Sequence, residues 1–404
     1  YCDILDRDLD FERVINGLCD ARILRRDVYG LTFNARFSYC YFLANYFKVK
    51  MDEPSTKSDV DHIVNTLYRR ESANTLLFLS HLAPGAWPLD MILQKAKGLF
   101  ERAPLWNLED DLKPILNKTP VKKDVTPKFP SKTPAENVVD EQAHDDELRR
   151  ENQSKADFDG RNLCISDDDG GSKDDDWEVI IREVRSAFKL IGIMGQVLKN
   201  NVDSMEGPIK KNLVETVFQL SRRMLGDAFL DLQKDLEDRR SDATKHFEMV
   251  QMESGKRGDR NELVVRADRE LLGVTSLACF AVTRNVVDAV GARGLHRTYA
   301  RVVSDDSSIP NRLYEVCLLM ENDPSFPLAK VTGLVHDLRR NWFGIQLVQW
   351  LVAYHFYMFD RPMQLRQQVL EKIDMGAAKT LNPDRQKTLG TRGLDDKRPG
   401  GRRR

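Results

Sequence analysis

The sequence lacks the short motifs that mark the common catalytic and metal sites. A phosphate-binding P-loop needs the spacing GxxxxGK[ST], because backbone amides and a lysine must surround the phosphates. Here the pair Gly255 and Lys256 has Val250 in place of the earlier glycine. No GxSxG nucleophile elbow, HExxH helix or CxxC pair occurs either. We therefore predict that the chain is not an enzyme and has no catalytic residues, no metal site and no cofactor.

Cysteine is scarce, and net charge is nearly absent. The formal net charge of −1 argues against a surface built entirely for nucleic acid. No basic-then-apolar leader follows Tyr1, so no signal peptide is expected. Widely spaced cysteines in apolar runs are typical of reduced thiols in a cytoplasmic protein. The six cysteines are Cys2, Cys19, Cys40, Cys164, Cys279 and Cys317.

The chain also lacks a fully apolar run long enough to span a bilayer. The closest stretch, Trp342 to Phe359, is slightly shorter than the roughly 20 apolar residues that a spanning helix needs. It also contains Gln346, Gln349 and His355. We predict that it is a buried helix of a bundle, and that the protein has no membrane partner.

What the sequence does contain is helical periodicity. Hydrophobic residues make up 41% of its 404 residues, enough for the cores of two or three domains. The predicted fold class is mainly α. The predicted divisions are a winged-helix-like unit at 1–50, a helical segment at 51–118, a disordered acidic linker at 119–176, a helical bundle or array at 177–375, and a disordered basic tail at 376–404.

The winged-helix prediction rests on a helix, a hairpin and a second helix in order. Phe11, Val14 and Leu18 recur at helical spacing, and Gly30 lies between two short strand-like runs. An aromatic-rich helix follows at 37–47. Such a unit can read DNA through a basic recognition helix, but this helix has no positive charge before Lys48. Its composition favours packing against protein, so nucleic acid is not expected as a partner.

Four stretches resemble the C-terminal region of bacterial STAND-type NTPases of the NACHT-like kind. They are 33–47 (FNARFSYCYFLANYF), 71–81 (ESANTLLFLSH), 187–200 (AFKLIGIMGQVLKN) and 341–359, which ends in HFYMF. They follow one another in the order found in that family, where a winged helix and a helical sensor region follow the NTPase core.

The resemblance implies a regulatory or sensor segment in bacterial signalling or antiviral defence. Its expected partners are the NTPase core and the effector domain of a parent protein, together with a protein or ligand trigger. The family's Walker motifs have no matching positions in this chain. The alternatives are a winged-helix DNA-binding regulator, with Arg22, Arg25 and Arg26 as its basic residues, and a non-catalytic helical scaffold.

Two groups of aromatic residues are candidate contact sites. Phe37, Tyr41 and Phe42 are predicted to pack inside the winged-helix unit or against the NTPase core. Trp342 and Trp350 lie eight residues apart, near one face of the late helix. Either both are core, or one of them reaches the surface and anchors a protein partner, because tryptophan is enriched at binding hot spots.

Overall fold

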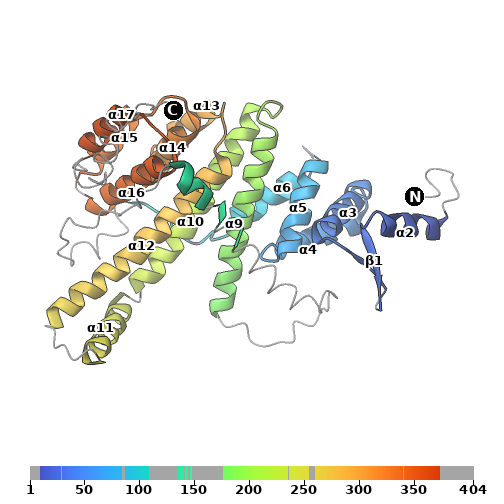
Figure 1. Cartoon of the computed structure of the whole chain (residues 1–404), viewed down its shortest axis with the longest axis horizontal. Coiled ribbons are helices and arrows are strands. Elements are labelled where there is room, and N and C mark those ends of the chain that lie inside the picture. The colour runs from blue at the N-terminus through green and yellow to red at the C-terminus, as the bar shows by residue number, and fades with distance from the viewer. Residues whose placement is uncertain are drawn as a thin grey trace, which may run out of the picture. The chain divides into compact units, whose positions relative to one another are not determined.

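The protein is described here by a computed structural model, in which residues 10–28, 30–83, 87–108, 134–140, 142–143, 146–147, 176–234, 236–253, 260–339 and 341–373 are described. In these ranges it is mainly helical, with a single two-stranded antiparallel sheet near the N-terminus (Figure 1). The predicted mainly-α class with a short β-hairpin is thereby confirmed. Most of the predicted acidic linker and the whole predicted basic tail lie outside the described residues. Within the linker range, residues 134–140 are helical.

The chain divides into two compact units, each assembled from distant parts of the sequence. Unit 1 comprises Tyr1–Ala103, Asp174–Met224 and Asp288–Ala292. Unit 2 comprises Pro104–Lys173, Leu225–Val287 and Arg293–Arg404. The long helices α10 (Gly207–Lys234) and α12 (Arg260–Val290) therefore contribute residues to both units.

The winged-helix-like unit begins unit 1. Helix α2 (Phe11–Asp20) is capped by the Asp10 side chain, which accepts a hydrogen bond from the Arg13 amide. Strand β1 (Leu24–Asp27) then pairs with β2 (Gly30–Phe33), and Leu24 lies opposite Phe33. Gly30 has a φ of +120°. Residues with a side chain rarely adopt this conformation for steric reasons, which explains why a glycine occupies this turn.

Helix α3 (Arg36–Val49) joins this unit to the remaining helices of unit 1. It packs against α5 (Arg70–Leu82) through Cys40, Ala44 and Phe47, which recur at three- and four-residue spacing and are all buried. The other helices of this part are α4 (Pro54–Asn65), α6 (Trp87–Gly98) and α9 (Asp176–Asn200). Pro54 occupies the first turn of α4. Amide groups in the first turn have no partner within the helix, so the missing amide hydrogen of proline costs no helical hydrogen bond.

Unit 2 is a set of packed helices. It includes the later parts of α10 and α12, and its remaining helices are α11 (Leu236–Glu253), α13 (His296–Asp305), α14 (Ile309–Asn322), α15 (Leu328–Asp337), α16 (Trp342–Met358) and α17 (Met363–Lys372). Helix α14 is buried at nearly every position from Ile309 to Met320 and packs against α13, α15 and α16. The late helix α16 was expected to be a buried helix of a bundle, and about half of its residues are buried, but α14 is the more completely enclosed of the two.

Candidate functional site

The most prominent candidate site is a set of partly exposed aromatic side chains on α3. Phe37 is 65% exposed, Tyr46 48%, Tyr41 42% and Phe42 40%. These four residues are called the aromatic face below. At about 3.6 residues per turn they span roughly half of the circumference of α3, from Phe37 beside the buried Ala44 round to Tyr46. At about 150–250 Å² per aromatic side chain, they expose on the order of 400 Å². A contiguous apolar patch of that size on a single chain often marks a binding surface.

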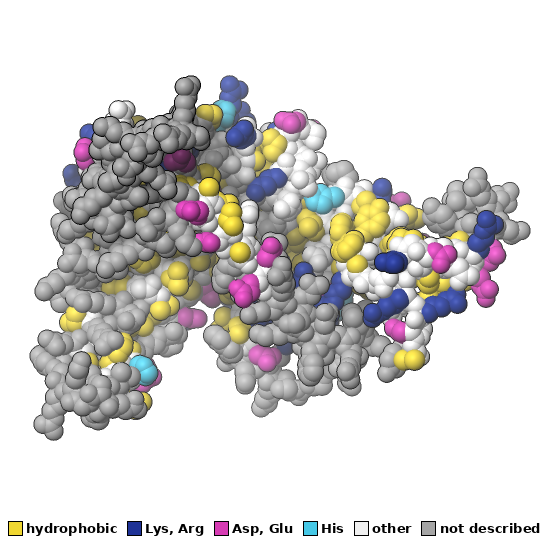
Figure 2. Space-filling model, viewed as in Figure 1, with side chains coloured by type: hydrophobic (Ala, Val, Ile, Leu, Met, Phe, Trp, Pro, Cys, Tyr) yellow, Lys and Arg dark blue, Asp and Glu magenta, His cyan; other side chains and the backbone are white. Residues whose placement is uncertain are grey.

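Ring contacts extend this surface onto neighbouring elements. Phe42 lies 5.7 Å from Phe33 of β2, between ring centroids, and 5.7 Å from Tyr41. Tyr41 also meets Phe78 of α5 edge to face, at 5.7 Å. Figure 2 shows hydrophobic side chains gathered over α3 and its surroundings. The hairpin, α3 and α5 therefore present one connected aromatic surface.

This exposure corrects part of the sequence-based interpretation. Phe37, Tyr41 and Phe42 were predicted to pack inside the winged-helix unit or against an NTPase core. The first of these alternatives is wrong for Phe37, which has 65% of its surface exposed. Helix α3 is apolar nearly all round, a composition typical of a buried helix, so the sequence offered no signal that one side of it would be uncovered.

We expect substitutions on the aromatic face to have little effect on stability. Phe37→Ser should change the free energy of unfolding by no more than about 0.5 kcal/mol, because the side chain is already largely in water. Phe42→Ala should cost less than about 2 kcal/mol, below the 3–5 kcal/mol typical of a fully buried phenylalanine. Urea unfolding followed by circular dichroism measures both. A loss above 3 kcal/mol for Phe37→Ser would show that the ring is covered in solution.

Charge near the hairpin bears on the DNA-binding alternative. Arg25 donates a hydrogen bond to Thr32 at 3.0 Å, and Arg26 donates one to Asn16 at 2.9 Å. Lys and Arg side chains are visible around the hairpin in Figure 2. The helix that follows, α3, presents aromatic side chains where a DNA-reading helix would present basic ones. This arrangement favours a protein partner.

The two tryptophans proposed as contact residues lie in α16. Trp342 and Trp350 are both half-buried. The Trp342 ring meets Phe343 edge to face, with 6.3 Å between centroids. Asn341 caps the helix, since its side-chain oxygen accepts from the Gly344 amide at 3.0 Å. Neither tryptophan is fully enclosed, so their proposed anchoring role stays a prediction.

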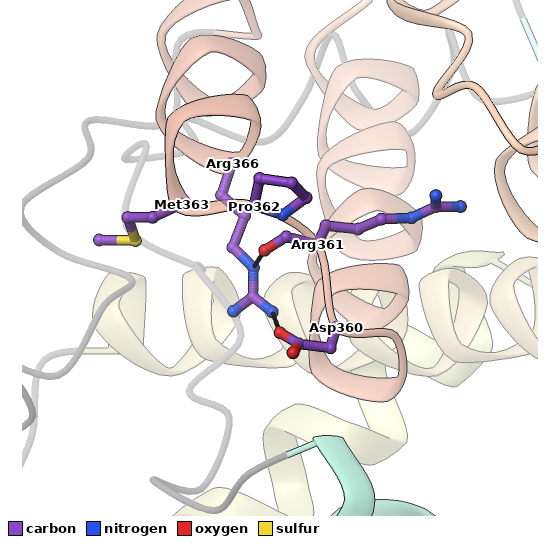
Figure 3. Close-up of a pocket in the computed structure, with 5 residues that line it drawn as sticks. All are labelled: Asp360, Arg361, Pro362, Met363 and Arg366. Carbon is purple, nitrogen blue, oxygen red and sulfur yellow. Dashed lines mark hydrogen bonds and ion pairs between the residues drawn. The ribbon is translucent and has the colours of Figure 1, made fainter.

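A hollow of about 450 Å³ lies at the loop that joins α16 to α17 and is lined by Asp360, Arg361, Pro362, Met363 and Arg366. Figure 3 shows Arg366 directed at Asp360, while Arg361 extends away from that pair. Arg366 donates to the Asp360 carboxylate at 3.0 Å and to the Arg361 carbonyl at 3.0 Å. Arg361 donates to the carbonyl of Met320 at 2.8 Å. Both guanidinium groups hold the loop between the helices together, which makes the hollow a poor anion site.

A buried polar cluster lies next to this loop. Arg284 of α12 forms an ion pair with Glu321 of α14, and the two side chains are only 15% and 12% exposed. The Arg284 guanidinium also sits 4.6 Å from the centroid of the Tyr354 ring. Burial raises the pKa of the nearby Cys317 thiol, and the negative charge of Glu321 raises it further by a smaller amount. The thiol is therefore held protonated and poorly nucleophilic.

His355 is the most strongly perturbed histidine of this region. Burial lowers its pKa to about 3, and the positive charges of Arg361, Arg284 and Arg366 act in the same direction. Its Nε2 atom accepts a hydrogen bond from Arg361 Nε at 3.2 Å, and its ring stacks on Phe359 at 4.8 Å. The carboxylates nearby, Glu321 and Asp360, are each paired with an arginine. The folded protein therefore keeps this imidazole neutral.

This neutral histidine predicts a specific loss of stability in acid. An unfolded histidine titrates near pH 6.5, whereas the folded side chain titrates at about 3. Between these values only the unfolded chain binds the proton. The free energy of unfolding should therefore fall as pH falls below 6.5, by up to about 1.4 kcal/mol per pH unit from this group.

The measurement is urea unfolding at about pH 7.5 and about pH 5 for the wild type and for His355→Gln, which keeps an acceptor for Arg361. The difference in stability between the two pH values should be smaller in the variant. An equal difference would show that His355 is not responsible, since the other titrating groups are common to both proteins.

Other sites are not assembled within the described ranges. No three His, Cys, Asp or Glu side chains there come together as a metal-binding group. The cysteines of those ranges form no disulfide.

Leu271–Val290 of α12 is long and apolar enough, by length and composition alone, to cross a membrane, and 44% of the tested window is buried. A core helix of a soluble protein passes the same test. The Trp342–Phe359 stretch examined from the sequence forms α16, and about half of its residues are buried.

Comparison with known proteins adds no relative. No protein family matches the sequence, and neither a curated protein nor a solved structure shows significant similarity to the chain.

Proposed function

We propose that this chain is the C-terminal regulatory segment of a NACHT-like STAND NTPase, and that the aromatic face of α3 docks on the NTPase core of that parent protein. The observation that carries the proposal is the partial exposure of Phe37, Tyr41, Phe42 and Tyr46, four aromatic side chains of a single helix. Water-exposed aromatic rings in this number are costly unless a partner covers them.

The residues that carry the family resemblance support the same partner. The stretch 33–47 is one of the four similar stretches, and it contains all four members of the aromatic face. In the family, the winged-helix unit that ends with this helix follows the NTPase core. A partner at this face would therefore be the domain that precedes it, with bacterial signalling or antiviral defence as the biological setting and a cytoplasmic location.

The DNA-binding regulator remains the second candidate because of the hairpin. Arg25 and Arg26 lie on β1, where a wing would contact a phosphate backbone. A wing alone supplies little sequence reading, since base contacts come from the recognition helix. The aromatic composition of α3 is the reason for preferring the protein partner.

The test is a parent NTPase that carries Phe37→Ser and Tyr41→Ser together, assayed for trigger-dependent ATP hydrolysis. We expect triggered activation to be lost while circular dichroism and thermal unfolding stay close to the wild type. The matched control is Val274→Ser with Leu277→Ser on α12, because these side chains are 68% and 61% exposed but lie elsewhere. Normal activation in the α3 variant would refute the proposal.

A further inference from the structure

Helix α2 has little support from the other residues that the structure describes. It is strongly amphipathic, with Phe11, Val14, Ile15 and Leu18 at helical spacing, yet none of its residues is buried. Phe11 is 73% exposed and Val14 41%. An isolated helix of this length is marginal in water, because most helical stability in proteins comes from packing of the apolar side.

The hairpin beside α2 is equally poor in buried side chains. Leu24 is the one buried hydrophobic residue among the described residues from 10 to 34, and Val28 is 92% exposed. Ordering a residue costs about 1–2 kcal/mol of backbone entropy, whereas burying one leucine side chain returns about 1.5–3 kcal/mol. The fully buried side chains therefore offset only a small part of the cost of ordering residues 10–34.

Charge on the hairpin indicates what would cover it. Arg22, Arg25 and Arg26 lie in or next to β1, and the hydrogen-bond partners of Arg25 and Arg26 named above are the uncharged Thr32 and Asn16. Asp27 is the one acidic side chain among the described residues of the hairpin, and it accepts a hydrogen bond from Thr32 at 3.2 Å, so the hairpin stays basic overall. A covering surface that brought acidic groups to this edge would gain charge-assisted hydrogen bonds. One that brought basic groups would be repelled.

We propose that α2 and the hairpin fold against a partner surface that is apolar at its centre and acidic at the edge facing Arg22, Arg25 and Arg26, so that their ordering is coupled to docking. The inference rests on the proposed function, which makes this partner the NTPase core. Together with the aromatic face, the exposed Phe11, Val14 and Leu31 bring the apolar surface close to the about 800 Å² that each partner buries in a standard interface.

Single-stranded nucleic acid is the other ligand that combines aromatic and basic contacts. The ring geometry favours protein instead. Tyr41 packs edge to face against both Phe42 and Phe78, so these rings contact one another where stacked bases would need open ring faces. The aliphatic Val14 and Leu31 extend the surface without offering anything for a base to stack on.

The first experiment uses the chain alone, with hydrogen–deuterium exchange read by mass spectrometry. Amides of α2, β1 and β2 should exchange at least about 100-fold faster than those of α5, although both groups are hydrogen-bonded in the folded form. Protection of α2 and the hairpin comparable to that of α5 would overturn the inference. That outcome leaves the proposed function untouched, because no NTPase is present in the experiment.

The second experiment repeats the exchange measurement on the chain joined to its NTPase core. Protection of α2 and the hairpin should rise about tenfold or more, and Arg25→Glu with Arg26→Glu should abolish the rise. The control is the double variant Lys57→Glu with Arg102→Glu, at two exposed basic residues of unit 1 outside the winged-helix-like unit. The rise in protection should persist in this control. A rise that survives reversal of the hairpin charges would overturn the acidic-edge assignment.

A labelled oligothymidylate serves as the nucleic-acid probe for the wild-type chain. We expect no binding at physiological salt. Binding that protects α2 and the hairpin, and that disappears in the arginine variant, would overturn the protein-partner assignment in favour of nucleic acid.

Discussion

Replacing Glu321 by glutamine should lower the free energy of unfolding by about 3–5 kcal/mol. The carboxylate pairs with Arg284, and both side chains are largely shielded from water. Removal of one charge leaves the guanidinium buried without its counterion, which costs more than the pair itself contributes. Urea unfolding that monitors the helical signal measures the loss.

The double variant Arg284→Met with Glu321→Leu is the informative control. Since it removes both charges and keeps apolar volume in their place, it should be far less damaging than Glu321→Gln, and buried pairs replaced in this way are often neutral. The Tyr354 ring would lose its contact with the guanidinium, which is worth about 1–2 kcal/mol. A single variant within about 1 kcal/mol of the wild type would show that the pair is hydrated in solution.

Gly195→Ala should destabilise the protein by about 1–3 kcal/mol, whereas Gly192→Ala should stabilise it by up to about 1 kcal/mol. Both glycines lie on α9, three residues apart, so helix propensity favours alanine equally at each. A Cβ at Gly195 would lie 2.3 Å from the backbone carbonyl oxygen of Ala289 in α12, but a Cβ at Gly192 would meet nothing within 4 Å. The contrast isolates the close approach of the two helices.

Thermal and urea unfolding of the two variants provide the measurement. The sign of the effect is the decisive readout, because it should differ between two chemically identical substitutions. Stabilisation by alanine at both positions would mean that α9 and α12 stand further apart in solution than the backbone contact at Ala289 requires.

Most secondary structure could be read from the sequence, because helices and turns depend on nearby residues. The aromatic-rich helix, the turn at Gly30 and the late tryptophan helix were each predicted, and each is present. The candidate site was only half predictable. The aromatic character of its residues was enough to single them out. Their exposure could not be predicted, because a helix that is apolar nearly all round gives no indication of which side is covered.

The sequence by itself determined where helices form, that the chain is mainly α, and that no recognisable catalytic motif is present. Spacing of apolar side chains is a local property, so periodicity is sufficient for the first two. Only the tertiary structure decided that Arg284 meets Glu321, that Gly195 adjoins Ala289, and that the aromatic face of α3 is left partly exposed. These outcomes depend on which helices pack together across long stretches of chain, and a local pattern carries no information about its distant partners.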